Sequence, residues 1–326
     1  MKGTQLRLLV TGGAGFIGSN FIRKAIGENW PGISHITVVD KLTYAGNKEN
    51  LRGVNPSDYE FIVADINDSS IFKKQISKTD AIINFAAESH VDRSIKNPRS
   101  FLESNVLGVQ NLLQISLEGG LQTFIQVSTD EVYGSITSGS WTEAEPLLPN
   151  SPYAASKASA DLICRSFFRT YGLDVRITRC SNNYGPFQNP EKLIPLIITN
   201  LATNKKIPIY GDGKNVRDWL HVDDHCKAIY NVLKFGSAGE IYNIGGGKEL
   251  TNLEIARIIL EKMGKNSDSI NFVENRLGHD QRYSVDASKI RMTLGFSPNT
   301  EFQTGIDSTL DWYLRNENWW RPLIQV

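Results

Sequence analysis

Four side chains that can move protons stand in two short segments of the chain. Asp130 and Glu131 lie side by side in QVSTDEVYGS, directly after the apolar run FIQVS. Tyr153 and Lys157 follow in SPYAASKAS, at a spacing that puts both on one face of a helix. A tyrosine is a poor base at neutral pH, but a lysine cation nearby favours its phenolate form. Together the two segments indicate a site for proton transfer; the alternative is that the acid pair is a solvated surface feature.

The elements that must position these residues follow from the apolar pattern. LRLLVT, ITVVD, YEFIVAD, AIINFAA, TFIQVS and DVRITRC predict strands. GFIGSNFIRKAIGEN, SFLESNVLGVQNLLQISLEGG and YAASKASADLICRSFFRTYG predict helices, and Gly172 ends the last of them. This alternation predicts an α/β fold with a Rossmann-type, doubly wound parallel sheet. Ligands bind such sheets beyond the carboxyl ends of the strands, where Ser128 and Thr129 precede the acid pair.

The segment LLVTGGAGFIGSN joins the first predicted strand to the first helix. Gly12, Gly15 and Gly18 permit a tight turn and let the backbone approach a pyrophosphate at the helix N-terminus. Asp40 ends ITVVD about 20 residues further on, where an acid binds the adenosine ribose diol and repels a 2′-phosphate. We therefore predict bound NAD rather than NADP, a preference that Lys41 weakens. A purely structural glycine turn is the alternative.

Composition and charge exclude several other classes of function. Lys plus Arg and Asp plus Glu both number 35, so the chain is neutral and gives no support for nucleic-acid or membrane binding. Cys164, Cys180 and Cys226 form no C-x-x-C pair, and the N-terminal apolar run is too short for a signal peptide. We therefore expect a cytoplasmic protein. His221 and His225 in HVDDH have no third ligand beside them, so no metal site is expected.

The character of the sequence changes after about residue 181. NNYGPFQNPEKLIP predicts a loop region and IPIYGDGKNVRDWL a hairpin or loop, whereas LIPLIITNLATN, HVDDHCKAIYNVLKFG and TNLEIARIILEKMG predict helices. No repeat or low-complexity linker marks a boundary. We predict a cofactor-binding Rossmann domain over residues 1–181 plus about 219–245. A smaller, mixed α/β substrate domain would comprise residues 182–218 plus about 246–326.

These features resemble a known family. The glycine loop, Asp40, Tyr153 and Lys157 are similar to those of the extended short-chain dehydrogenase/reductases. Further segments, spread over nearly the whole chain, resemble the dTDP-glucose 4,6-dehydratase branch of this family. They are VDKLTYAGN, AAESHVDRSI, STDEVYG, SPYAASKA, SNNYGPFQNPEKLIPL, YGDGKNVRDWLHVDDH, YNIGG and GHDQRYSVDASKI. The place where this chain has Thr129 and the acid pair separates the related enzymes. The 4-epimerases typically lack the acid pair there. The GDP-mannose dehydratases have a pattern similar to Thr-Ser-Glu, and the CDP-glucose dehydratases one similar to Asp-Lys. Leu277 stands where the family often has proline, which is a loop difference.

The resemblance implies a redox-neutral dehydration of dTDP-glucose with NAD as cofactor. Tyr153 would remove the C4 hydroxyl proton as hydride leaves C4, and the new ketone would acidify the C5 proton. Elimination then needs one ionised and one protonated group. By the family match Glu131 is the base, Asp130 is the acid for the C6 hydroxyl, and Thr129 binds the C4 oxygen. Consecutive strand residues face opposite ways, so this requires the pair to lie past the strand end.

The same resemblance assigns the binding residues, with Lys157 joining the catalytic group. The expected NAD ligands are Gly12, Gly15, Phe16, Ile17, Gly18, Asp40, Lys41, Thr43, Asp65, Ile66, Ala86, Ala87, Ser89, Asn105, Val127, Tyr153, Lys157 and Cys180. The expected substrate ligands are Glu88, Thr129, Asn182, Lys192, Leu193, Pro208, Tyr210, Arg217, Asn252, Arg276, His279 and Tyr283.

Two further expectations concern the substrate and the assembly. Arg217 and Arg276 are the expected phosphate ligands, because guanidinium binds phosphate in a bidentate manner; a surface ion pair is the alternative for either. In relatives the helices around Asn105 and Tyr153 pair across a homodimer as a four-helix bundle, and we expect the same here.

Two rival hypotheses remain. One is another nucleotide-sugar 4,6-dehydratase or a 4-epimerase of the same family. The other is a non-catalytic NAD-sensing protein, which the intact tyrosine, lysine and acid pair argue against. A single methyl group separates the bases thymine and uracil, so the sequence leaves the base open. The sequence also does not name the sugar at the end of the pathway.

Overall fold

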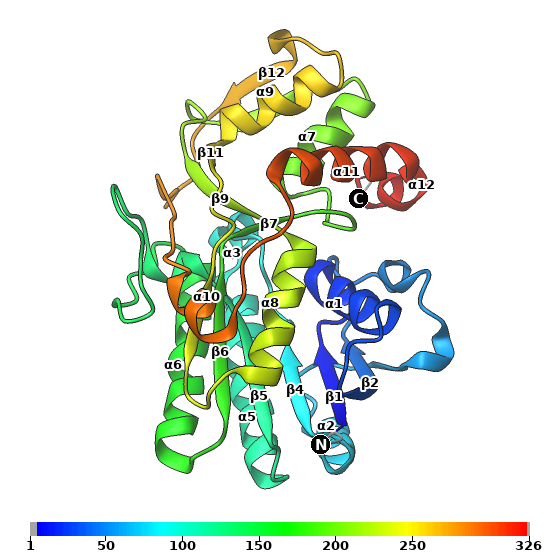
Figure 1. Cartoon of the computed structure of the whole chain (residues 1–326). Helices are drawn as coiled ribbons and strands as arrows, with labels where there is room; N and C mark the ends of the chain where they lie inside the picture. Colours follow the sequence, from blue (N-terminus) through cyan, green and yellow to red (C-terminus); the bar gives the residue numbers. More distant parts are fainter. Residues whose placement is uncertain (1–4, 325–326) are drawn as a thin grey trace.

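A seven-stranded parallel sheet forms the centre of the chain, as the alternating pattern predicts (Figure 1). The computed structural model describes residues 5–324, so positions 1–4 and 325–326 of the predicted domain division lie outside it. The strand order is β10-β6-β5-β4-β1-β2-β3, and every neighbouring pair is parallel. The strands are β1 (Leu6–Thr11), β2 (Ile33–Asp40), β3 (Glu60–Val63), β4 (Ala81–Asn84), β5 (Thr123–Thr129), β6 (Val175–Cys180) and β10 (Ile241–Ile244). The prediction of a Rossmann-type sheet is confirmed.

Helices cover both faces of this sheet. Along β1, Leu8 and Val10 belong to the apolar cluster under α1 (Phe16–Gly27) and α8 (Val222–Phe235), whereas Leu9 points into the cluster on the other face. That second cluster is covered by α2 (Ser69–Gln75), α5 (Gly108–Glu118) and α6 (Pro152–Tyr171). Burial on both faces explains why these strands are continuous apolar runs instead of alternating patterns.

The rest of the chain builds smaller layers around two short sheets. β9 (Val216–His221) pairs parallel with β7 (Asn182–Tyr184) and antiparallel with β11 (Glu249–Thr251), and β8 (Ile207–Tyr210) pairs parallel with β12 (Ile270–Val273). The hairpin interpretation of IPIYGDGKNVRDWL is therefore wrong. β8 and β9 each find a partner from a distant part of the sequence, which local alternation does not reveal.

The helices of this smaller part surround a third apolar cluster. They are α7 (Leu193–Ala202), α9 (Asn252–Lys262), α11 (Phe302–Arg315) and α12 (Glu317–Trp320). α10 (Ser288–Leu294) instead returns to the seven-stranded sheet, where Ile290 joins the cluster under α1 and α8. The remaining helical segments are α3 (Val91–Lys96), α4 (Pro98–Leu102), η1 (Lys48–Leu51), η2 (Pro56–Asp58), η3 (Ile76–Lys78), η4 (Glu103–Leu107), η5 (Asp130–Tyr133), η6 (Ser267–Ser269) and η7 (Arg321–Ile324). Among the described residues no helix is long and apolar enough to cross a membrane.

Local capping signals set the two segments that carry the acid pair and the tyrosine. The Ser151 hydroxyl accepts a hydrogen bond from Ala154 N, and Pro152 fills the first position of α6. Gly172 ends α6 in the left-handed region, as predicted. β5 ends at Thr129, whose hydroxyl caps η5 by accepting from Glu131 N. The acid pair therefore lies past the strand end, where the backbone turns.

A buried polar network joins these segments to the sheet. The Asp161 carboxylate on α6 accepts from the Arg179 guanidinium of β6 at 2.8 Å. Arg179 also donates to the Tyr133 hydroxyl at 2.7 Å, and Tyr133 donates to the Asn243 side chain of β10 at 2.9 Å. One network thus fixes η5 and α6 relative to two adjacent strands.

We expect Asp161→Ala to destabilise the fold strongly. It leaves the Arg179 guanidinium, whose side chain is 4% exposed, buried without its carboxylate. Breaking a buried pair in this way costs about 3–5 kcal/mol. Urea unfolding measures the free energy of unfolding. Asp311→Ala, which removes the exposed partner of Arg315, is the control and should change it by less than about 1 kcal/mol. Equal losses in the two variants would contradict a structural role for the network.

Candidate active site

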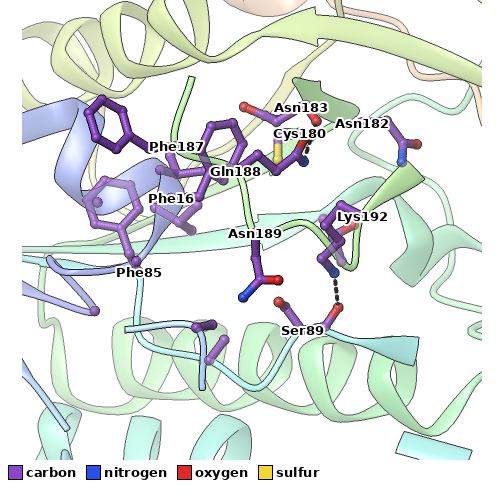
Figure 2. A pocket seen from close by; sticks show the side chains of 18 of the residues that line it. Phe16, Phe85, Ser89, Cys180, Asn182, Asn183, Phe187, Gln188, Asn189 and Lys192 are labelled. Carbon is purple, nitrogen blue, oxygen red and sulfur yellow. Dashed lines mark hydrogen bonds between the residues drawn. The ribbon is translucent and has the colours of Figure 1, made fainter. Parts of the chain in front are cut away.

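A cleft lies at the carboxyl end of the parallel sheet, between the glycine loop and the segment that follows β6 (Figure 2). We call it the main cleft. Of the predicted site residues it is lined by Gly12, Gly15, Phe16, Ile17, Gly18, Ala87, Ser89, Val127, Thr129, Asp130, Glu131, Tyr153, Lys157, Cys180, Asn182 and Lys192. An adjoining smaller pocket, the side hollow, is lined by Gly12, Gly15, Asp40, Lys41, Thr43, Asp65, Ile66, Ala86, Ala87 and Glu88. Catalytic and cofactor candidates far apart in sequence thus meet at one edge of the sheet.

The glycine loop has a shape that only glycine permits. A Cβ on Gly12, whose φ is +68°, would stand 2.5 Å from Ala86 N, and one on Gly18 would stand 2.4 Å from Gly12 O. The Asp40 carboxylate braces this loop, because it accepts from Ala14 N at 2.9 Å and from Leu42 N at 2.7 Å. Burial raises the Asp40 pKa, and these two N–H groups oppose that shift. A cradle too tight for side chains, with an acid at its rim, fits a dinucleotide.

Two predicted cofactor residues at the side hollow bind each other. Lys41 Nζ lies 2.6 Å from a carboxylate oxygen of Asp65. The Lys41 ammonium lowers the Asp65 pKa, against the effect of burial. Because its charge is compensated in this way, Lys41 offers less attraction to a 2′-phosphate than the sequence suggests.

Tyr153 and Lys157 are both buried at the floor of the main cleft. Lys157 Nζ donates to Val127 O at 2.7 Å. Burial lowers the Lys157 pKa, and Asp161 one turn further along the helix raises it. Burial, followed by Glu131 and Cys180, raises the Tyr153 pKa well above 10, whereas a hydrogen bond with Thr129 lowers it. In the chain alone Tyr153 is therefore a neutral phenol at pH 7.

The two carboxyls of the acid pair have unlike surroundings. Asp130 is 2% exposed, and its Oδ2 has no hydrogen-bond partner among the described residues. Burial raises the Asp130 pKa well above its usual value, and the neighbouring Glu131 and Asp218 raise it further. Burial also raises the Glu131 pKa, but Arg276, Arg217 and Lys192 lower it. Asp130 thus tends to keep its proton, and the cations favour ionised Glu131.

Those three cations concentrate positive charge in a chain that is neutral overall. Arg217 is buried, donates to Asp280 O at 3.0 Å, and lies with its guanidinium 4.3 Å from the centre of the Tyr283 ring. Arg276 has a buried Nε without a partner among the described residues. Lys192 Nζ donates to Ser89 O at 2.7 Å, the dashed line in Figure 2. None of the ion pairs among residues 5–324 includes Arg217 or Arg276, so the alternative of a surface ion pair is not supported there.

Several predicted residues lie outside the two pockets. Asn105 is a brace: it accepts from Glu88 N at 2.9 Å and donates to Ser156 Oγ at 2.9 Å, which ties the end of β4 to α6. The Tyr210 hydroxyl faces Asp92 at 3.4 Å, and its ring meets His279 edge-on. The predicted substrate residues that do not line the main cleft or side hollow are Leu193, Pro208, Tyr210, Arg217, Asn252, Arg276, His279 and Tyr283.

Sequence reasoning missed part of the cleft wall. Tyr44, Phe187, Asn189, Trp319 and Leu323 also line the main cleft. The Asn- and Pro-rich composition of residues 182–195 indicated only a loop there. Trp319 and Leu323 belong to no motif, and they reach the cleft through tertiary packing, which the sequence does not show.

No group of three or more His, Cys, Asp or Glu residues that could hold a metal ion occurs among the described residues. His225 is fully buried and shares its Nδ1 with Asn183 Oδ1 at 2.8 Å, and burial lowers its pKa to about 3. The His221 Nδ1 accepts from Asp223 N as the cap of α8. Both histidines therefore have structural surroundings.

Comparison with known proteins places this site in a family. Residues 9–309 match the family model described as GDP-mannose 4,6 dehydratase. The dTDP-glucose 4,6-dehydratase of Streptomyces niveus is 52% identical over 321 residues, which is 98% of this chain and 96% of that protein. DesIV, the dTDP-glucose 4,6-dehydratase of Streptomyces venezuelae solved with NAD and TYD, is 54% identical with a TM-score of 0.96, covering 98% of this chain and 100% of that one. The Bacillus anthracis dTDP-glucose 4,6-dehydratase, solved with NAD, is 46% identical with a TM-score of 0.90, covering 98% and 99%. The chain therefore belongs to the family of the GDP-mannose 4,6 dehydratase model, within its dTDP-glucose 4,6-dehydratase branch.

Proposed function

We propose that this chain is an NAD-dependent hydro-lyase that converts dTDP-glucose to dTDP-4-keto-6-deoxyglucose and water, a step in deoxysugar biosynthesis. The observation that carries the proposal is the acid pair of unlike carboxyls, Asp130 and Glu131, beside Tyr153 in one cleft. Relatives named dTDP-glucose 4,6-dehydratase at about half identity over nearly the whole chain support the substrate. DesIV, solved with NAD, supports the cofactor.

NAD, when bound, would accept a hydride from C4 of the sugar and return it to C6. Gly12, Gly15 and Gly18 would bring backbone amides to its pyrophosphate, and Asp40 would face the adenosine ribose. The ion pair between Lys41 and Asp65 favours NAD over NADP, since it compensates the charge that Lys41 would otherwise offer to a 2′-phosphate.

Tyr153 would take the proton of the C4 hydroxyl in the first step. Thr129, which lines the same cleft, would hold the C4 oxygen against it. Lys157 is anchored on Val127 O and brings positive charge to the floor of the cleft, where it favours the phenolate over the neutral phenol. Tyr153 and Lys157 would therefore act as base and electrostatic support.

Elimination would use the two carboxyls together. Glu131, whose ionised form the surrounding cations favour against the effect of burial, would take the C5 proton once C4 is a ketone. Asp130, kept protonated by burial, would give its proton to the C6 hydroxyl, which leaves as water. The proton held on Glu131 would then return to C5. One base and one acid act at neighbouring carbons, as dehydration requires.

The diphosphate would lie among the cations contributed by the smaller part of the chain. Arg217 and Arg276 present guanidinium groups near Glu131, and Arg276 Nε is buried without a partner in the described chain. A guanidinium in that state is suited to a bidentate phosphate contact.

The acid pair provides the test of this function. The purified protein should convert dTDP-glucose, and UDP-glucose less well, to a product lighter by one water. Asp130→Asn and Glu131→Gln should each lower product formation roughly 10²- to 10⁴-fold. In D2O, Asp130→Asn should still exchange the C5 proton of the recovered sugar, because its base is intact, and Glu131→Gln should not. Mass spectrometry and NMR of the sugar measure both effects.

Several outcomes would contradict the proposal. Product at the wild-type rate from the double variant would make the acid pair a surface feature. With sugar deuterated at C4, dehydration puts the label on C6 of the same molecule. Label that returns to C4 with inversion would instead support the 4-epimerase hypothesis.

We expect Asp130→Asn to be more stable to heat than the wild-type protein, and we expect this difference to grow as the pH rises. The Asp130 pKa is higher in the folded chain than the ordinary 3.8, so the folded state favours the protonated carboxyl. Its contribution to stability is full below the ordinary pKa and is lost as the pH rises through the folded pKa. Thermal unfolding should therefore show a larger gain in Tm at pH 8 than at pH 5.

Glu131→Gln is the matched control for this measurement. Arg276, Arg217 and Lys192 oppose the rise of the Glu131 pKa, so the gain in Tm should be smaller. A gain for Asp130→Asn that is independent of pH would argue against a protonated buried acid.

We propose further that the chain is a homodimer, assembled through a four-helix bundle. Leu102, Leu107 and Leu162 on α4, η4 and α6 are 52%, 56% and 56% exposed, so these helices carry apolar side chains in solvent in the single chain.

We also propose a cytoplasmic location, because all three cysteines are free and buried.

Leu107→Glu should convert the dimer to a monomer, because it puts a charge into the proposed interface. Light scattering after gel filtration measures the mass. Phe235→Glu is the control: Phe235 is 64% exposed at the end of α8, which covers the other face of the seven-stranded sheet, and its replacement should leave the mass unchanged. A wild-type mass of one chain would rule out the dimer.

A further inference from the structure

The C-terminal helices reach the cofactor end of the main cleft. Figure 1 shows α11 and α12, in orange-red and red, above α1, in blue. Trp319 in α12 and Leu323 in η7 line the cleft together with the glycine loop. We propose that Trp319, acting through Asn50, is a positioning residue that clamps the glycine loop and slows release of NAD. The inference rests on the proposed function only in that NAD occupies this cleft.

A chain of hydrogen bonds links Trp319 to the glycine loop. Trp319 Nε1 donates to Asn50 Oδ1 at 2.9 Å, and Asn50 Nδ2 donates to Ala14 O at 2.8 Å. Ala14 N in turn donates to the Asp40 carboxylate at 2.9 Å. Asn50 is 2% exposed and Trp319 is 6% exposed, so neither amide nor indole can exchange its partner for bulk water. Trp319 of α12 is thereby connected to the glycine loop and to Asp40, which are expected to hold the dinucleotide.

The same C-terminal residues support the opposite wall of the cleft. Phe187 lines the cleft with a φ of +67°, a conformation that is costly for a residue with a side chain. Its ring packs against Trp312 and Trp319, at centroid distances of 4.4 and 5.6 Å, and the Arg23 guanidinium lies 4.0 Å from its centre. Trp319 therefore contacts the cleft segment after β6 through Phe187, and it also bonds Asn50, which is bound to the glycine loop.

The adjacent Trp320 separates this role from general packing. Trp320 is fully buried, and its Nε1 donates to Tyr313 O at 2.8 Å within the apolar cluster of the smaller part. It does not line the main cleft. Each of the two neighbouring tryptophans thus makes one indole hydrogen bond. Only the hydrogen bond of Trp319 connects to the glycine loop, through Asn50.

Release of NAD from the holoenzyme tests the clamp. Protein loaded with radiolabelled NAD is diluted into excess unlabelled NAD, and retained label is followed on filters. Trp319→Phe keeps an aromatic ring and removes the donor, so Asn50 Oδ1 is left buried without its partner; we expect release about tenfold faster. Trp320→Phe should lower thermal stability to a comparable degree and leave the release rate at the wild-type value.

A second variant tests whether Trp319 acts through Asn50. Asn50→Leu should also release NAD faster, and adding Trp319→Phe to it should give no further increase, because one chain of contacts is already broken. Additive effects, unchanged release in Trp319→Phe, or equal release in the Trp319 and Trp320 variants would each overturn the clamp. Immediate loss of label from the wild-type protein would also overturn the clamp, whereas a protein that binds no NAD at all would contradict the proposed function.

Discussion

Burial of two adjacent carboxyls at the end of β5 is the constraint on which the arrangement of the site depends. A buried ionised carboxylate is costly unless it is neutralised or paired. The chain uses both solutions at successive residues, because burial raises the Asp130 pKa and so favours its protonated form, and three cations favour the ionised form of Glu131. Arg217 comes from β9, and Lys192 and Arg276 come from loops of the smaller part. The parallel sheet alone could not hold this pair, so the second part of the chain is needed for the electrostatics of the first.

The buried network behind the pair is what makes the separation of roles possible. Tyr133 ends η5 and is held by Arg179 and Asn243, so the turn that carries both acids cannot rotate freely. Asp161 forms an ion pair with Arg179, and its negative charge also raises the Lys157 pKa. Rigid support of this kind keeps two neighbouring carboxyls in different environments, and without it they would exchange their protonation states.

The sequence predicted those parts of the structure that depend on local pattern. The six strands of the first half, the end of α6 at Gly172 and the glycine loop follow from residue spacing and the special geometry of glycine. The turn after Thr129 was required by the family resemblance and not by local pattern. The pairing of β8 with β12 and the contribution of Trp319 to the cleft did not, because their partners are distant in sequence. The ion pair between Lys41 and Asp65 was also missed, since each residue was assigned separately to the cofactor.

The acid pair also bears on the first step of the proposed reaction. Glu131 is the largest charged influence on Tyr153, and it raises the tyrosine pKa. A tyrosine base and an ionised glutamate base in one cleft therefore oppose each other, and positive charge must compensate both. Lys157 lies on the sheet side of the cleft, and the arginines lie on the side of the smaller part. A phosphate bound to those arginines would neutralise part of the charge that favours ionised Glu131, so substrate binding itself would raise the basicity of Glu131. The base would then be strongest when the sugar is in place, which couples recognition of the diphosphate to proton removal at C5.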